Sequence, residues 1–222
     1  MNQKEKKEKS IWAFGSGKTI IAKKFLVTVI GLFVMAQGVA LYLMMDVGVD
    51  PISVFLDGMS IRTGMSFGMA QTVLNLIMVT LSLIFFRWNV GLSTLAALFL
   101  LGPFYDIIMA IQGSLITPEL SFLSKTILVI LAQLLFSLGV AMYQSPEMGA
   151  SPCDTPGVSI SKLKGWDYGR VRIASDAIFF LCGLFLGGSI GIGTICCVLF
   201  TGPVSQLFRP YCDRLIHAIS SS

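Results

Sequence analysis

Six long apolar segments dominate this chain, and a helix needs about 20 such residues to cross the hydrocarbon core of a bilayer. They cover residues 25–46, 68–86, 91–112, 123–144, 170–188 and 191–209. Only 13% of the 222 residues are charged, whereas a soluble domain typically has about 25%. Polar groups therefore cannot cover the surface. The sequence predicts an all-α membrane protein of six transmembrane helices, whose first partner is the lipid bilayer.

Lysine and arginine residues near the ends of these segments predict the orientation, because positive residues gather on the cytoplasmic side. A six-span chain places four such regions on one side, namely 1–24, 87–90, 145–172 and 209–214. The opposite side holds Arg62 and Lys125. We therefore expect both termini in the cytoplasm. Residues 1–24 are expected to be a basic tail rather than a cleaved signal, since the next apolar run is long enough to span.

The two halves of the chain repeat each other. At an offset of 101 residues, identical residues recur for Gly38, Val39, Ala40, Tyr42, Gly48, Pro51, Ser60, Gly64 and Gly68. At an offset of 100 they recur for Gly91, Thr94, Gly102 and Pro103. Each half holds three spans, so the second half must enter the membrane inverted, as in many transporters. We expect repeats at 25–112 and 123–217, a linker at 113–122 and a tail at 218–222.

Each half also contains a loop that is too apolar for ordinary exposed chain. The loops read GVDPISVFLDGMS (48–60) and GASPCDTPGVSIS (149–161). Asp50-Pro51 and Ser151-Pro152 place a capping residue before proline, the preferred order at a helix start. The pattern predicts short helices at about 50–62 and 151–163. Both a re-entrant half-helix and a helix lying flat at the interface fit these lengths.

Polar side chains in or beside the spans are the candidate binding residues, because such groups are costly in a membrane. They are Asp50, Asp57, Asn75, Asp106, Asp154, Asp176, Tyr42 and Tyr143. The set is rich in oxygen and mostly acidic, which suits a cation, an amine or a proton-coupled solute. Two simpler interpretations stay open. Arg172 and Asp176 have the spacing of a local ion pair, and the two tyrosines can be interfacial anchors.

Prolines mark candidate gates or kinks in both halves. They are Pro51 and Pro152 in the loops, and Pro103 and Pro203 in the spans, each of the latter preceded by a glycine, Gly102 and Gly202. Proline inside a helix frees a carbonyl, which needs a partner at membrane depth. A kink that only aids packing is the alternative.

The chain holds no arrangement typical of an enzyme. Its one histidine, His217, lies near the C-terminus, and its five cysteines show no CxxC spacing. We therefore predict no catalytic residues, no metal site, no cofactor and no nucleic-acid partner.

Six stretches of the chain carry a family resemblance. The first half contains GVDPISVFLDGMS, TGMSFG and GLSTLAALFLLGPFYD, and the second half contains GASPCDTPGVSIS, GWDYGRVR and GGSIGIGTICCVLFTGPVSQLF. These stretches resemble the YczE-like (YczE/YyaS/YitT) bacterial integral membrane proteins. The resemblance covers about residues 30–210. It implies a multi-pass protein of the bacterial plasma membrane and supplies no substrate. Asp154 stands where family members often have an Asp, but Leu56 precedes Asp57 where a His is often found.

Three functions fit these features. The first is a secondary transporter or uptake component for a small polar or cationic solute, with its site at mid-membrane between the repeats. The second is a non-transporting accessory protein that acts on another membrane or biosynthetic system. It would present the glycine-rich 183–191 segment to a partner helix. The third is a channel or a substrate-binding subunit of a larger uptake complex. A homo-oligomer is compatible with each.

Overall fold

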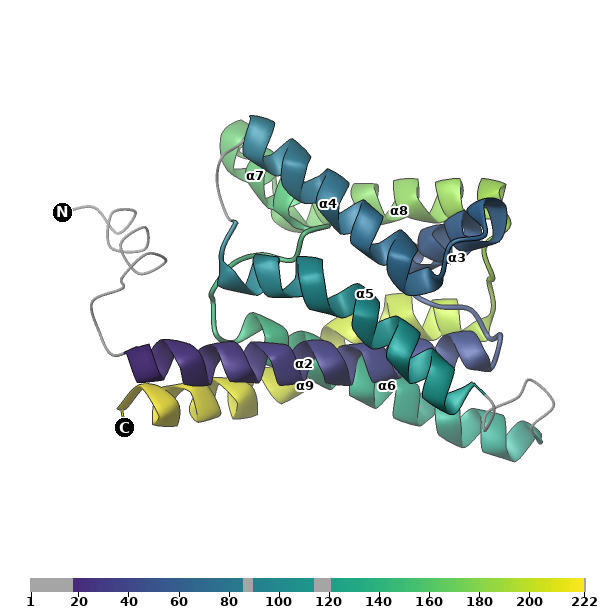
Figure 1. Ribbon diagram of the computed structural model, residues 1–222, viewed down its shortest axis with the longest axis horizontal. Coiled ribbons are helices and arrows are strands. Elements are labelled where there is room, and N and C mark those ends of the chain that lie inside the picture. Colours follow the sequence, from purple (N-terminus) through teal and green to yellow (C-terminus); the bar gives the residue numbers. More distant parts are fainter. Residues whose placement is uncertain (1–17, 86–89, 114–120, 222) are drawn as a thin grey trace.

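The computed structural model describes residues 18–85, 90–113 and 121–221, which form eight α-helices and no strand (Figure 1). The helices are α2 (Lys18–Met44), α3 (Pro51–Thr63), α4 (Phe67–Phe85), α5 (Leu92–Gln112), α6 (Phe122–Gln144), α7 (Thr155–Lys164), α8 (Tyr168–Leu186) and α9 (Ile192–Ser221). The all-α class predicted from the apolar segments is therefore confirmed.

Five helices, α2, α4, α5, α6 and α9, are long and apolar enough to cross a membrane. The sixth expected span, 170–188, corresponds to α8, which is not among these five and carries Arg170, Arg172 and Asp176 in its first half. Large apolar side chains such as Phe99 and Phe122 remain exposed, as contact with lipid requires.

The expected basic tail and linker are only partly described. The helix α2 begins at Lys18, so residues 18–24 of the expected tail are helical. Residues 1–17 of the tail and 114–120 of the linker lie outside the described residues, as do residues 86–89.

The same local structures recur in both halves at the sequence offset. The ends of α4 and α8 lie 101 residues apart, and α5 and α9 begin 100 residues apart. The two short helices α3 and α7 end before Gly64 and Gly165, whose φ angles are 73° and 68°. A left-handed conformation favours glycine, so these two glycines fix the same helix end twice.

The starts of the short helices differ. Asp50 accepts a hydrogen bond from the backbone N–H of Ser53, and Pro51 is the first residue of α3, as the Asp-Pro pair predicts. In the second half the carbonyl of Ser151 accepts from the N–H groups of Asp154 and Thr155, and the residues after Pro152 form a turn. The helix α7 therefore begins at Thr155, later than the Ser-Pro pair predicts.

The centre of the molecule is α2, which packs against α5 and α6, while α6 packs against α9. In Figure 1, α2 and α6 run in opposite directions, as do α4 and α8, and also α5 and α9. Close contacts occur in exchanged pairs along α2 and α6. A Cβ on Gly38 would lie 2.5 Å from the backbone nitrogen of Phe136, and one on Gly139 would meet the backbone nitrogen of Met35. These residues are equivalents at the 101-residue offset.

The loops show the same exchange. The N–H of Ser93 donates to the carbonyl of Met148 (3.1 Å), and the N–H of Gly193 donates to the carbonyl of Val47 (2.8 Å). Each donor and each acceptor corresponds to its counterpart at the repeat offset. The chain leading to each short helix is thereby fixed to the start of a long helix from the other half.

Glycines also bring α3 against α8. A Cβ on Gly183 would lie 2.6 Å from the backbone nitrogen of Phe55, and one on Gly58 would lie 2.8 Å from the carbonyl oxygen of Gly183. Gly183, in the segment that an accessory protein was expected to offer to a partner, is thus covered by α3 of the same chain, whereas Gly187 is exposed.

Candidate functional site

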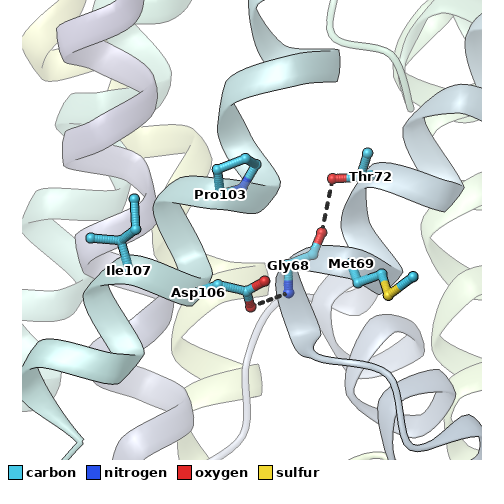
Figure 2. Close-up of a pocket in the computed structure, with 6 residues that line it drawn as sticks. All are labelled: Gly68, Met69, Thr72, Pro103, Asp106 and Ile107. Carbon is cyan, nitrogen blue, oxygen red and sulfur yellow. Dashed lines mark hydrogen bonds between the residues drawn. The ribbon is translucent and has the colours of Figure 1, made fainter.

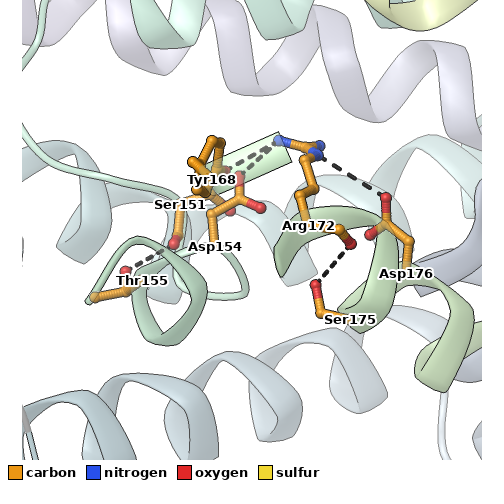
Figure 3. A network of polar contacts seen from close by, with 7 residues as sticks. All are labelled: Ser151, Asp154, Thr155, Tyr168, Arg172, Ser175 and Asp176. Atoms are coloured by element: carbon orange, nitrogen blue, oxygen red, sulfur yellow. Dashed lines mark hydrogen bonds and ion pairs between the residues drawn. The ribbon is translucent and has the colours of Figure 1, made fainter. Parts of the chain in front are cut away.

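Arg172 of α8 connects two carboxylates of the candidate set (Figure 3). Its Nη1 lies 3.3 Å from Oδ2 of Asp154, and its Nε lies 3.9 Å from Oδ2 of Asp176. The hydroxyl of Tyr168, one turn earlier on the same helix, lies 3.4 Å from the same Nη1. The local Arg172–Asp176 ion pair considered from the sequence is therefore present, but it is the longer of two.

Asp154 is available for this pair because its side chain makes no helix-cap hydrogen bond at the start of α7. Its side chain is 18% exposed, against 41% for Arg172. The ion pair is thus partly screened from solvent, and it joins the start of α7 to α8.

Cys153 lies within electrostatic range of three of the candidate acidic residues. Burial raises the pKa of its thiol, and the charges of Asp154, Asp50 and Asp176 raise it further, while Arg172 lowers it. The thiol is therefore neutral at physiological pH. Three carboxylates from separate segments therefore lie within electrostatic range of this thiol. We call Asp50, Asp154 and Asp176 the acidic cluster.

Asp50 comes from the first half of the chain. Burial raises the pKa of its carboxyl, and hydrogen bonds from Ser53 oppose that effect. The Ser53 hydroxyl donates to Oδ1 at 2.6 Å. Asp50 therefore serves both the cap of α3 and the acidic cluster.

Asn75 of α4 reaches the same region through a buried amide network. Its Nδ2 donates to the carbonyl of Ala97 on α5 (3.1 Å), and its Oδ1 accepts from Nε2 of Gln71 (2.8 Å). The thiol of Cys153 lies 3.6 Å from the same Oδ1. Cys153 therefore contacts Asn75 and lies within electrostatic range of Asp176, while the expected sharing of one site by Asn75 and Asp176 stays a prediction.

The two equivalent tyrosines differ in their partners. Tyr42 of α2 donates to Oε1 of Gln133 on α6 (2.8 Å). The hydroxyl of Tyr143 has no hydrogen-bond partner although the residue is only 4% exposed. Both tyrosines are buried, and Tyr143 lies within electrostatic range of Asp154 and Cys153. A buried hydroxyl without a partner beside a carboxylate is a place where a ligand can bind.

Two candidate acids serve other contacts. Oδ2 of Asp57 accepts from the backbone N–H of Ser189 in the α8–α9 turn (2.7 Å). Asp106 of α5 accepts from the hydroxyl of Ser66 (2.7 Å) and the N–H of Gly68 (2.9 Å) at the start of α4. Both carboxylates thus accept hydrogen bonds from the backbone of a neighbouring helix or turn, and their role in binding stays a prediction.

Two tyrosines near the acidic cluster, Tyr105 and Tyr168, were not among the binding residues that the sequence predicted. Tyr105 of α5 is buried within electrostatic range of Asp50 and Cys153. Tyr168 was detectable, since its spacing from Arg172 places both on one helix face. Tyr105 lies one residue before Asp106, and only the packing of α5 shows which of the two faces the cluster.

No metal coordination shell forms within the described part of the chain, where no three His, Cys, Asp or Glu side chains are close enough to hold an ion.

These features define an integral membrane protein, built from long apolar helices with a polar cluster inside. The chain belongs to a family of unknown function, DUF6198, which matches residues 22–210.

Three curated proteins are similar along most of their length. The chain is 26% identical to an uncharacterized protein of Haemophilus influenzae, over 93% of this chain and 92% of that protein. It is 26% identical to the uncharacterized protein YyaS of Bacillus subtilis (86% and 94% covered) and 27% identical to the uncharacterized membrane protein YczE of the same organism (84% and 86%). The YczE-like resemblance is thereby confirmed. No solved structure matches the chain.

Proposed function

We propose that this protein is a secondary transporter for a small cationic or polar solute, and that the solute binds at the acidic cluster. The observation that carries the proposal is a set of polar contacts that involves both halves of the chain. Arg172 pairs with Asp154 and Asp176, and Asn75 of the first half contacts the thiol of Cys153, the residue before Asp154. Ionisable groups inside a membrane protein are costly and are retained where they bind or move something.

An inverted repeat supports this function. The opposed directions of corresponding helices and the exchanged contacts of the loops are what a pseudo-two-fold axis between two halves produces. Transporters built in this way bind their solute between the repeats. Asp50 and Asn75 come from the first half, and Asp154, Asp176 and Tyr143 from the second.

The charge of the site favours a cation. Three carboxylates face a single guanidinium, so the cluster is negative unless protons or a cation compensate it. The cluster lacks a metal coordination shell among the described residues, and the free hydroxyl of Tyr143 offers a hydrogen-bond partner. A small organic amine satisfies both, because an ammonium group pairs with a carboxylate and donates to a hydroxyl.

The orientation that fits the positive residues places both termini in the cytoplasm of a bacterial cell. The start of α2 and the end of α9 lie at the same end of the molecule in Figure 1, which supports this arrangement. Reporter fusions at each terminus test it, and an external reporter at the C-terminus would reject it.

Thermal-shift measurements on the purified full chain test the solute. Amines, amino acids, vitamins and metal ions are screened, and we expect amines to raise the melting temperature of the wild type. Asp154→Asn and Asp176→Asn should lose that shift. Asp213→Asn is the control, because Asp213 pairs with exposed Arg209 one turn away in α9.

Uptake into vesicles of the solute found in this way completes the test. Asp176→Asn should abolish uptake, whereas Asp213→Asn should retain it. A solute that stabilises the protein but is never taken up would favour an accessory or solute-binding role. A shift produced by metal ions alone would contradict the organic cation.

A further inference from the structure

Corresponding helices of the two halves pack against different neighbours. In the first half α4 packs along α5, whereas in the second half α8 makes no comparable contact with α9. Instead α8 packs along α3, and the equivalent pair, α7 and α4, makes a much smaller contact. Similar sequences thus occupy two different arrangements in one molecule.

Glycines on both helices make the α4–α5 contact possible. Figure 2 shows one of them, Gly68, beside Asp106. A Cβ on Gly102 would collide with the carbonyl oxygen of Gly68 and with Oγ1 of Thr72, and a Cβ on Gly68 would lie 2.6 Å from Cγ of Asp106. The N–H of Gly68 donates to Asp106, which holds the start of α4 on α5. Next to this contact is a surface pocket of about 390 Å³, which Met69 and Ile107 also line.

The equivalent glycines of the second half are present but make no such contact. A Cβ on Gly202 would meet no atom within 4 Å, and one on Gly169 would meet only Oδ1 of Asp167, at 3.2 Å. Gly202 is exposed, whereas Gly102 is buried. Nothing in the present packing of α8 and α9 requires either glycine.

We propose that the protein exchanges between two conformations. In the second one, each half adopts the helix packing that the other half has in the present structure. In the second conformation α8 leaves α3 and packs along α9, with Gly169 against Gly202, while α4 separates from α5. Gln206, the counterpart of Asp106, then offers its amide oxygen to the N–H of Gly169. The inference rests on the inverted repeat of the proposed function and not on the identity of the solute.

Packed helix pairs switch between discrete arrangements rather than deforming continuously. Two hydrogen bonds join α3 to the end of α8 and to the turn that follows it. They are the hydrogen bond from Ser189 to Asp57 (2.7 Å) and that from Nε of Arg62 to the carbonyl of Leu186 (3.2 Å). The counterpart of Asp57 is Val158, which cannot accept such a bond. The present conformation is therefore stabilised by a hydrogen bond of Asp57 at the α3–α8 contact. The equivalent contact between α7 and α4 in the second conformation lacks such a bond.

Spin-label distances at equivalent positions test the exchange. One pair is placed at Met69 and Ile107, which line the same pocket on α4 and α5. The other is placed at the equivalent residues of α8 and α9, Arg170 and Leu207, both exposed. Both pairs are introduced into the full chain with its five cysteines replaced, reconstituted in nanodiscs.

We expect a short distance in the first pair and a long one in the second, each with a minor population of the opposite length. Gly102→Ala and Asp57→Ala should enrich the exchanged population in both pairs together, because they disfavour the present arrangement. Gly202→Ala is the matched variant. Its side chain has room in the present conformation and would collide in the second, so it should remove the minor population while preserving the fold.

Three results would overturn the proposal. One is a single unchanged distance for both pairs in the wild type, in Asp57→Ala and in Gly102→Ala. Another is simultaneous short distances in both pairs, because α8 would then close without α4 opening. The third is a minor population that survives Gly202→Ala. None of these measurements requires a solute, so failure of the exchange is distinguishable from failure of the transport proposal. Should Gly102→Ala not fold, Asp57→Ala carries the test.

Discussion

Arg172 of α8 and Asp154 at the start of α7 form an ion pair of 3.3 Å that joins two helices of the second half beside Cys153. The same guanidinium also lies 3.9 Å from Asp176. Arg172 therefore compensates two carboxylates at once. Its loss would leave both without a cation in the described part of the site.

Replacing Arg172 by glutamine should lower the free energy of unfolding by about 1–2 kcal/mol, between the values for exposed and buried pairs. Arg209→Gln is the matched control, because Arg209 and Asp213 form an exposed pair at the same spacing and at 3.9 Å. We expect it to cost less than about 0.5 kcal/mol. Chemical unfolding in detergent measures both, and equal losses would show that the cluster is no more than a solvated surface pair.

Asp50→Asn should change how stability depends on pH. Burial raises the pKa of Asp50 above its ordinary value of 3.8, so the folded state holds the proton more tightly than the unfolded state does. The wild type is then destabilised as the pH rises through the raised pKa. Asparagine preserves the cap oxygen but does not titrate.

Melting temperatures of the wild type and Asp50→Asn between pH 4 and pH 8 (about the range that a detergent-solubilised protein tolerates) check this. The variant should gain stability relative to the wild type as the pH rises. The prediction is contradicted if the difference in melting temperature between the variant and the wild type stays constant with pH, or if it shifts in favour of the wild type as the pH rises. Either result would show that ionisation of Asp50 does not destabilise the folded state.

The helices were predictable from the sequence because apolar length and helix-start signals act locally. Asp50 and Pro51 cap and start α3 as expected. The start of α7 was misplaced because Ser151 and Pro152 look alike in sequence to Asp50 and Pro51, whereas the chain forms a turn before Thr155. The carboxylate of Asp154, at the end of that turn, pairs with Arg172.

The candidate site was predictable only in its chemistry. Acidic residues were identified by their cost in a membrane, but the sequence does not show which of them meet. Asp57 and Asp106 met the same criterion, yet they cap Ser189 and Gly68 in other elements. These contacts span 132 and 38 residues, so only the packing of whole helices reveals them.

The carboxylate of Asp57 connects α3 to the α8–α9 turn through a hydrogen bond, so its removal should destabilise that turn. Asp57→Ala removes the acceptor of the Ser189 N–H and should cost about 1–2 kcal/mol. Asp57→Asn keeps an acceptor oxygen and is the control, with an expected loss below about 0.5 kcal/mol. Hydrogen exchange at residues 187–191 should accelerate in the alanine variant alone. Equal acceleration in both variants would assign the effect to the charge rather than to the hydrogen bond.

The equivalent tyrosines provide an internal comparison of a structural and a ligand-facing hydroxyl. Tyr42→Phe removes the donor to Oε1 of buried Gln133 and should cost about 1–2 kcal/mol, because the amide oxygen is left unsatisfied. Tyr143→Phe removes a hydroxyl that has no partner, so stability should stay within about 0.5 kcal/mol of the wild type. The same variant should weaken the thermal shift produced by an amine, whereas Tyr42→Phe should preserve it. Thermal unfolding with and without the amine separates the two roles. An amine shift that survives Tyr143→Phe would remove this hydroxyl from the binding site.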